Sequence, residues 1–266
     1  PADARWAYAN PALEADFGHR ATHVTTLVAK EVVANFYGDR PAWAYFRGCS
    51  TGGRQGLVAA ERYPGDFDGI IAGAPFDQSL SVPQMAWALA ANTGPDGKPL
   101  LGRTEFDLLG KAALKACDGA DGQGDGVIAD PPACGFRPEQ LVCAADGAAT
   151  RPCLTPAQAE AARKIYAGPV TRAGKPWSSG GAPVGSEFTW AKSLLASPGE
   201  RPFFRFIVEN WSRYLAYDPD PPFPPAVPDA VAGPKLPAVD FDAGPAQFRA
   251  TAAVAGYRGD LDRYRA

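Results

Sequence analysis

The sequence has few histidines and no feature that favours a membrane or nucleic-acid partner. Only two of its 266 residues are histidine, and its formal net charge is -3 with a pI of about 5.5. This balance gives no basic surface for nucleic acid or an anionic membrane, and no apolar run reaches spanning length. The opening Pro1-Ala2-Asp3 lacks the features of a signal peptide. We therefore expect that processing removed a leader, or that the sequence is an excised part of a longer one.

The remaining composition is that of a globular chain with many loops. Hydrophobic residues make up 46% of the sequence, which supports a core, while 27 prolines and 29 glycines indicate many turns. The length suits one large domain or a domain that carries an insertion.

One stretch combines a strand, a sharp turn and a helix. Residues 42–46 are apolar and aromatic, as in a short buried strand, and residues 55–62 have a helical pattern. Between them lies Gly48-Cys49-Ser50-Thr51-Gly52. This order matches the G-x-S-x-G nucleophile elbow, in which a strained serine stands between a strand and a helix.

The elbow predicts a specific chemistry for two residues. Ser50 would be the nucleophile, and small neighbours would let strand and helix approach closely around it. The Thr51 N–H would lie at the helix N-terminus, where it can stabilise an oxyanion. The alternative is a glycine-rich turn in which Ser50 only caps the helix.

The residues around the motif closely resemble the tannase/feruloyl esterase family, which includes enzymes acting on gallate, hydroxycinnamate and terephthalate esters. The resemblance rests on FRGCSTGGRQ at 46–55, ERYP at 61–64 and DFDGIIAGAP at 66–75. It implies an α/β-hydrolase core with Ser50 as the nucleophile. In this family a disulfide joins the cysteine before the serine to a cysteine after the catalytic histidine, and Cys49 matches the first of these.

The order of predicted elements favours a parallel α/β sheet followed by a lid. A helix over 19–37 precedes the elbow, and 69–73 is predicted as another buried parallel strand. Later residues show helices and loops with little strand pattern. The resemblance implies a hydrolase core over 1–76, a large and mostly helical lid over 77–245, and a return to the core over 246–266, with the core incomplete at both ends.

Two histidines lie four residues apart on the first predicted helix. His19 and His23 have the spacing of a metal pair, but the third ligand and general base of an H-E-x-x-H site are absent. We therefore interpret them as surface or capping residues. Further along, Thr104 with Asp107 is predicted to open one helix, and Thr155 begins a capping box for another.

Aromatic residues recur through the predicted lid, where they would roof an aromatic acyl group or simply form its core. Taken one at a time, each is better explained as core. They are Trp87, Trp177, Phe188, Trp190, Trp211 and Tyr214.

An acidic loop over 117–128 places three aspartates among four glycines. Calcium prefers several hard oxygen ligands on a backbone free to curl around it. The carboxylates of Asp118, Asp121 and Asp125 and the carbonyls of Gln123 and Val127 would supply them. The spacing is not that of an EF-hand, and a solvated Asp-Gly turn is the alternative. The lid of the resembled family carries a calcium loop with this aspartate spacing, which favours structural calcium.

Five cysteines leave at least one unpaired within this sequence. Cys117 and Cys134 bracket the acidic loop, and Cys143 and Cys153 close a second short loop. Sequence alone does not fix the connectivity, but both pairings fit the lid of the resembled family. Cys49 is then left without its partner.

No histidine follows Ser50, although α/β-hydrolase triads run Ser, Asp or Glu, then His. The resemblance implies that the acid, the histidine and the partner of Cys49 lie beyond Ala266, and that earlier strands precede Pro1. We therefore expect an internal fragment that is inactive and poorly soluble in isolation.

Together these features predict a secreted or periplasmic serine carboxylic ester hydrolase that acts on a small aromatic ester through an acyl-enzyme, with no nucleic-acid or membrane partner. Two alternatives stay open. One is an α/β-hydrolase acting on peptides or non-aromatic esters, and the other is a non-catalytic, calcium-stabilised binding module.

Overall fold

The computed structural model describes residues 3–144, 152–171, 173–197 and 202–216. The chain divides into two compact units. Of the described residues, the first unit holds 3–82 and 210–216, and the second holds the others from Pro83 to Glu209. The first division thus falls a few residues beyond the predicted core boundary at 76. The predicted return segment, 246–266, lies outside the described residues.

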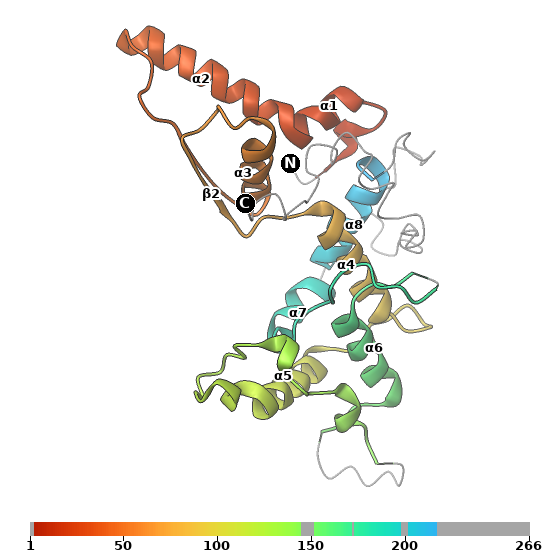
Figure 1. Cartoon of the computed structure of the whole chain (residues 1–266). Coiled ribbons are helices and arrows are strands. Elements are labelled where there is room, and N and C mark those ends of the chain that lie inside the picture. Colours follow the sequence, from red (N-terminus) through yellow and green to blue (C-terminus); the bar gives the residue numbers. More distant parts are fainter. Residues whose placement is uncertain (1–2, 145–151, 172, 198–201, 217–266) are drawn as a thin grey trace. The chain divides into compact units, whose positions relative to one another are not determined.

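The first unit begins with short helical turns and continues with alternating helices and strands (Figure 1). Its elements in chain order are η1 (Arg5–Ala7), α1 (Pro11–Ala15), the π-helix η2 (Asp16–Arg20), α2 (Ala21–Tyr37), β1 (Tyr45–Cys49), α3 (Thr51–Arg62), β2 (Gly69–Gly73), the start of α4 (Gln78–Ala91) and the end of α8 (Phe203–Tyr214).

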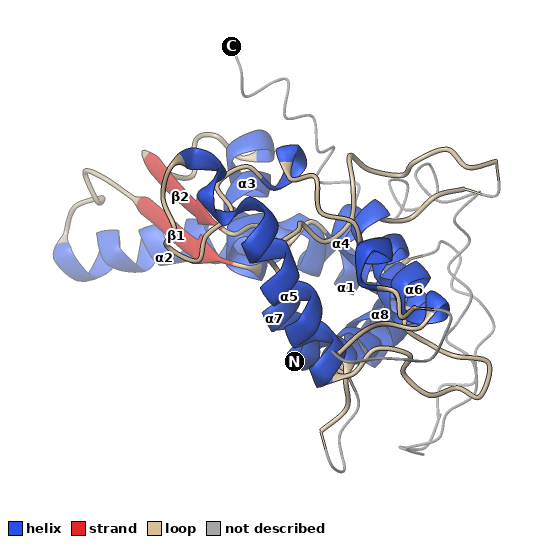
Figure 2. Ribbon diagram, turned by 90° about the horizontal axis from the view of Figure 1, so that it is seen from below, coloured by secondary structure: helices blue, strands red, loops and turns tan. Residues whose placement is uncertain are grey.

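The two strands of the first unit form a parallel pair (Figure 2). Tyr45 lies opposite Gly69, and the register continues to Cys49 opposite Gly73. The alternation of helix and parallel strand is therefore confirmed. The bounds of β2 agree with the sequence, but β1 lies three residues further along than the predicted strand at 42–46.

Neither strand is as buried as its apolar sequence predicted. Tyr45 is 72% exposed and Ile71 is 66% exposed. The prediction was wrong because, among the described residues, each strand has one strand neighbour and α3 packs against the pair. On the packed side, a Cβ at Gly56 would lie 3.1 Å from Ile70 Cγ2 and 3.2 Å from Phe46 Cε1.

Helix α2 ends as predicted, but its apolar side is exposed. Gly38 adopts φ +80° and donates its N–H to Ala34 O at 2.9 Å, which terminates the helix. The apolar residues of this side are between 46% and 79% exposed; they are Val24, Leu27, Val28, Val32 and Phe36.

The second unit is helical, and its described residues contain isolated bridges but no strand. In addition to most of α4 and the start of α8, it contains α5 (Arg103–Cys117), η3 (Asp118–Asp121), η4 (Pro131–Ala133), η5 (Pro138–Leu141), α6 (Pro156–Ala167) and α7 (Glu187–Leu194). This composition agrees with the helical, loop-rich region predicted there.

The sequence predicted the first residues of two helices in this unit, and one of the two predictions is correct. Thr155 and Gln158 form the predicted capping box, with Gln158 N to Thr155 Oγ1 at 3.2 Å and Thr155 N to Gln158 Oε1 at 2.8 Å. Thr104 does not open α5 as predicted. Gly102 precedes the helix and donates its N–H to Glu105 Oε2 at 2.8 Å. This carboxylate satisfies a backbone donor that has no partner within the helix, so the helix begins earlier than Thr104.

No helix within the described ranges is both long enough and apolar enough to cross a membrane.

Candidate active site

Ser50 stands between β1 and α3 in a backbone conformation that a serine rarely adopts. Its φ is +59° and its ψ is -117°. These are the angles of the first central residue of a type II′ turn, a position that usually requires glycine. Its side chain makes no capping hydrogen bond, so the alternative of a simple helix-capping serine is wrong.

Three backbone hydrogen bonds hold this conformation. Ser50 N donates to Gly73 O at 3.0 Å, which extends the pairing of β1 with β2 by one step. Its carbonyl accepts from Arg54 N at 3.0 Å and from Phe76 N at 3.1 Å. The serine is therefore fixed by the first turn of α3 and by the segment that follows β2.

The glycines of the motif are not equally constrained. A Cβ at Gly48 would lie 2.3 Å from Gly52 O, and one at Gly53 would lie 2.3 Å from Gly73 O. Both contacts involve backbone atoms, which cannot move aside. A Cβ at Gly52 would meet nothing within 4 Å. The close approach of strand and helix is therefore confirmed, but the glycines that permit it are Gly48 and Gly53.

The residues beside Ser50 are open to solvent. Thr51 is the first residue of α3, so its N–H has no acceptor within the helix. Ser50 and Thr51 are both exposed. Cys49 is a free and exposed thiol. This arrangement is able to present a hydroxyl and a backbone donor to the same ligand.

The two histidines bind other groups and not Ser50. His19 Nδ1 lies 2.6 Å from Tyr63 Oη, and His23 Nδ1 lies 2.8 Å from Asp66 Oδ2. The ring of His23 also stacks on Tyr63 with centroids 3.9 Å apart. Burial lowers the pKa of His19, assisted by the nearby arginines.

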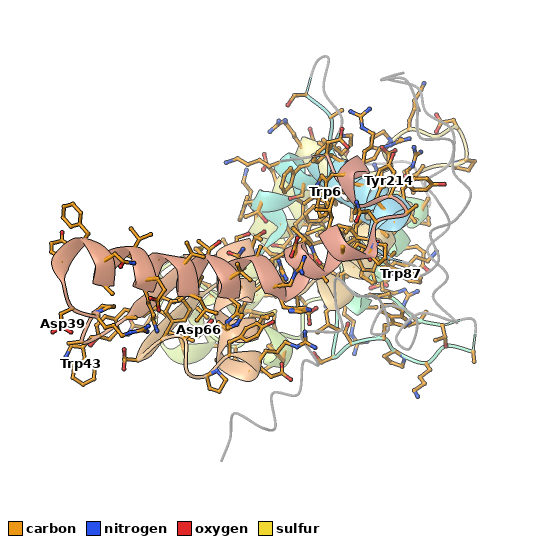
Figure 3. All side chains as sticks on the ribbon, turned by 90° about the horizontal axis from the view of Figure 1, so that it is seen from above. Trp6, Asp39, Trp43, Asp66, Trp87 and Tyr214 are labelled. Atoms are coloured by element: carbon orange, nitrogen blue, oxygen red, sulfur yellow. A yellow bond between two sulfur atoms is a disulfide. The ribbon has the colours of Figure 1, made fainter. Side chains whose placement is uncertain are left out.

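The interpretation of these histidines as surface or capping residues is therefore wrong. They are half-buried and connect η2 and α2 to the residues after α3, where Asp66 lies beside α2 (Figure 3). His19 in η2 and His23 in α2 both bind residues that follow α3, which sequence spacing alone does not reveal.

A separate open groove of about 580 Å³ lies between α2 and the start of β1. Its lining includes threonines of α2, Lys30, Phe46 and Phe67, but not Ser50. It therefore does not provide a pocket for the carbonyl that the serine would attack.

Arg54 is the site residue that sequence reasoning missed. It lies one turn after Ser50 and is only 4% exposed. Burial lowers its pKa to about 10, while the nearby Asp77 acts in the opposite direction. The available signal was an arginine within a glycine-rich turn, but nothing in the sequence shows that its side chain points inward.

Both disulfides of the second unit are present in the structure. Cys117 joins Cys134 with a Cα–Cα distance of 5.6 Å, and Cys143 joins Cys153 at 5.0 Å. The first of them closes the segment that contains the acidic loop.

The aspartates of the acidic loop bond to its own backbone. Asp118 Oδ1 accepts from Gly126 N at 2.9 Å, and Asp121 Oδ1 and Asp125 Oδ1 accept from residues two positions on. Among the described residues, no three His, Cys, Asp or Glu side chains are grouped to hold a metal. As placed, these carboxylates do not form a calcium shell, so calcium binding at Asp118, Asp121, Gln123, Asp125 and Val127 stays a prediction.

Several of the predicted lid aromatics are core residues. Trp190 is 5% exposed and packs on Phe106 and Tyr166 at centroid distances of 5.6 and 5.2 Å. Trp211 and Tyr214 are also buried, whereas Phe188 is 46% exposed. The core explanation therefore holds for the three buried rings.

A strained serine after a parallel strand, before a helix N-terminus and beside the end of the next strand, defines the nucleophile elbow of an α/β-hydrolase-like fold. The chain belongs to the tannase and feruloyl esterase family, whose model matches residues 1–201.

Similar proteins include a probable feruloyl esterase B-2 of Aspergillus flavus, 37% identical over 214 residues that cover 80% of this chain and 40% of that protein. A mono(2-hydroxyethyl) terephthalate hydrolase of Piscinibacter sakaiensis is 32% identical, with 91% of this chain and 45% of that protein covered. The crystal structure of feruloyl esterase B from Aspergillus oryzae superposes with a TM-score of 0.74 at 28% identity, covering 97% of this chain and 49% of that one. The chain thus spans less than half the length of these relatives.

Proposed function

We propose that this chain carries the nucleophile of a serine carboxylic ester hydrolase that acts on aromatic esters through an acyl-enzyme. The observation that carries the proposal is the conformation of Ser50, with φ +59° at the end of β1. A serine is held in such a conformation only where its surroundings determine it, and such strain concentrates at functional sites.

In the proposed reaction Ser50 Oγ attacks the ester carbonyl and its proton passes to a general base. The Thr51 N–H donates to the oxyanion of the tetrahedral intermediate. When the intermediate collapses, the bond to the alcohol oxygen breaks and the base returns the proton to the leaving alcohol. Water then cleaves the acyl-enzyme by the same route, which releases the acid and restores the serine.

The proposed substrate class follows from the names of the relatives. A feruloyl esterase and a mono(2-hydroxyethyl) terephthalate hydrolase both act, by name, on a carboxylic ester of an aromatic acid. Both are at least 30% identical to this chain over most of its length. We infer an aromatic acyl group for this chain as well, and the role of the second unit as a lid stays a prediction.

We propose that the base of this reaction comes from another part of a longer protein. Neither His19 nor His23 is hydrogen bonded to Ser50, since they bind Tyr63 and Asp66. Free serine is a poor nucleophile without an adjacent base. We therefore propose that the isolated 266-residue chain does not turn over esters, and that Cys49 pairs with a cysteine beside that base.

We also propose that the acidic loop takes up a structural calcium ion. Each of its three aspartates has one oxygen on a backbone N–H, so the second oxygen of each carboxylate is a potential ligand. The two disulfides suit the oxidising conditions outside the cytosol, which supports a secreted or periplasmic protein.

The test compares the full-length protein with its Ser50→Ala variant on methyl ferulate, methyl gallate, mono(2-hydroxyethyl) terephthalate and a peptide substrate. We expect hydrolysis of at least one aromatic ester, its loss in the variant, and an acyl adduct on Ser50 in mass spectra of quenched reactions. Hydrolysis that persists in Ser50→Ala would refute the role of Ser50. Activity restricted to peptides would refute the substrate class, and folded protein without hydrolase activity would favour the binding-module alternative.

A further inference from the structure

We propose that Arg54 is a positioning residue for Ser50: its side chain fixes the first turn of α3 against the π-helix η2, and this anchor holds the nucleophile in its strained conformation. The proposal rests on the proposed function, because it assigns a role in the reaction of Ser50.

Arg54 forms hydrogen bonds through both its backbone and its side chain. Its backbone N–H donates to Ser50 O at 3.0 Å. Its guanidinium donates from Nη1 to Gly18 O at 2.9 Å and from Nη2 to Phe17 O at 3.0 Å. One residue therefore links the carbonyl of the nucleophile to two carbonyls of an element more than thirty positions earlier.

The guanidinium group suits this site better than an ammonium group. Two nitrogens of one planar fork reach adjacent carbonyls, and the plane lies over the Phe17 ring at 4.8 Å from its centroid. A lysine offers a single charged nitrogen and cannot make both bonds with the same geometry. The site is therefore specific for arginine and not only for a positive charge.

The burial of Arg54 is costly, which argues against an incidental contact. The residue is 4% exposed, and Nε is buried without a hydrogen-bond partner among the described residues. The pKa of its guanidinium falls to about 10 because burial disfavours the charged form. An apolar side chain would fill the space at lower cost. The presence of a charged group is therefore explained by the two carbonyls that it binds.

The element at the other end of this link is also unusual. In η2 the N–H of Ala21 bonds to Asp16 O, five residues back, as in a π-helix. Such turns are rare and occur frequently at functional sites. Here the π-helix contains Phe17 and Gly18, the two residues whose carbonyls accept from Arg54.

The experiment uses the full-length protein and four variants, Arg54→Met, Arg54→Lys, Ser50→Ala and the control Arg40→Met. Arg40 is exposed and pairs with Glu31 on α2, away from the elbow. Active sites are counted by covalent labelling with a fluorophosphonate, so that kcat refers to folded, labelled molecules. The rate constant of labelling is a second measure of Ser50 reactivity that does not depend on substrate binding.

We expect Arg54→Met to lower kcat per labelled site by about 100-fold with KM unchanged, the loss typical of a small displacement of a catalytic group. Labelling should slow in parallel, Arg54→Lys should recover part of the loss, and Arg40→Met should match the wild type. A purely structural role would instead lower the labelled fraction and leave kcat per site unchanged, which would overturn the proposal.

If Arg54→Met yields no folded protein, Arg54→Lys decides the question. A lower kcat per site in that variant supports the proposal, and a wild-type value overturns it. Ser50→Ala separates a failure of the proposed function from a failure of the role of Arg54, because activity that survives in this variant refutes the proposed function itself. Loss in Ser50→Ala together with normal kcat in the Arg54 variants refutes only the role of Arg54.

Discussion

The elbow and the acidic loop both contain backbone with positive φ, but they place it on different residues. In the acidic loop the positive φ values, +89° and +81°, fall on Gly122 and Gly126. In the elbow the value of +59° falls on Ser50. Glycine adopts this region without steric cost, whereas a serine there stores about 1 to 3 kcal/mol of strain.

The hydrogen bonds that hold the two regions also differ, in how far along the chain their partners lie. The aspartates of the acidic loop bond to backbone groups within that loop. Ser50 instead donates its N–H to the neighbouring strand, and its carbonyl accepts from the first turn of α3 and from the segment after β2. A conformation that local sequence favours needs only local partners, and a strained one needs partners from several elements.

The largest loss of stability is expected where the backbones of the strand and the helix approach each other in the elbow. Gly48→Ala would place its Cβ 2.3 Å from Gly52 O and should destabilise the full-length protein by about 3 kcal/mol or more. Gly52→Ala is the matched control, because nothing lies within 4 Å of its Cβ and alanine favours a helix. Urea denaturation measures both variants, and equal midpoints would show that the close approach is not rigid.

Removal of the disulfide that closes the acidic loop should have the next largest effect. Replacing Cys117 and Cys134 by serine releases a loop with a sequence separation of 17 and should cost about 2 to 3 kcal/mol. The disulfide Cys143–Cys153 closes a shorter loop, with a separation of 10, so its removal should cost less. Thermal unfolding under non-reducing conditions measures this order, and the reverse order would contradict it.

Calcium should stabilise the acidic loop without affecting the elbow. At a concentration ten times its Kd, calcium should add about 1.4 kcal/mol and raise Tm relative to protein in EGTA. The double variant Asp121→Asn with Asp125→Asn should lose this increase. Asp96→Asn is the control, because Asp96 also accepts from a backbone N–H two positions on, at Lys98 N. Equal Tm values with and without calcium in the wild type would refute calcium binding.

The smallest effects on stability are expected when the residue type is changed at the positions with positive φ. Ser50→Gly should stabilise the full-length protein by about 1 kcal/mol because it releases the strain while it removes the proposed nucleophile. Gly122→Ala should destabilise by about 1 kcal/mol for the opposite reason. Ser50→Ala keeps a Cβ and should gain less than Ser50→Gly. If the two Ser50 variants are equally stable in urea, the backbone of Ser50 is not strained.

Local chemistry explains which expectations from the sequence were correct. The Thr155 capping box, the Gly38 helix end and the bounds of β2 depend on residues close together in the chain. The expected burial of the strands failed because it depends on distant neighbours. The roles of His19 and His23 failed for the same reason, since their partners are more than forty positions away.

By itself, the sequence determined the elbow, because a strand pattern, a serine with small glycines nearby and a helix pattern follow one another directly along the chain. It also determined the family through the residues around that serine. Only the tertiary structure decided what holds Ser50 in place. The strand pairing with Gly73, the anchor of Arg54 on Phe17 and Gly18, and the need for a small residue at Gly53 join segments far apart in the chain. Such contacts depend on packing, which the order of residues does not show until the chain is folded.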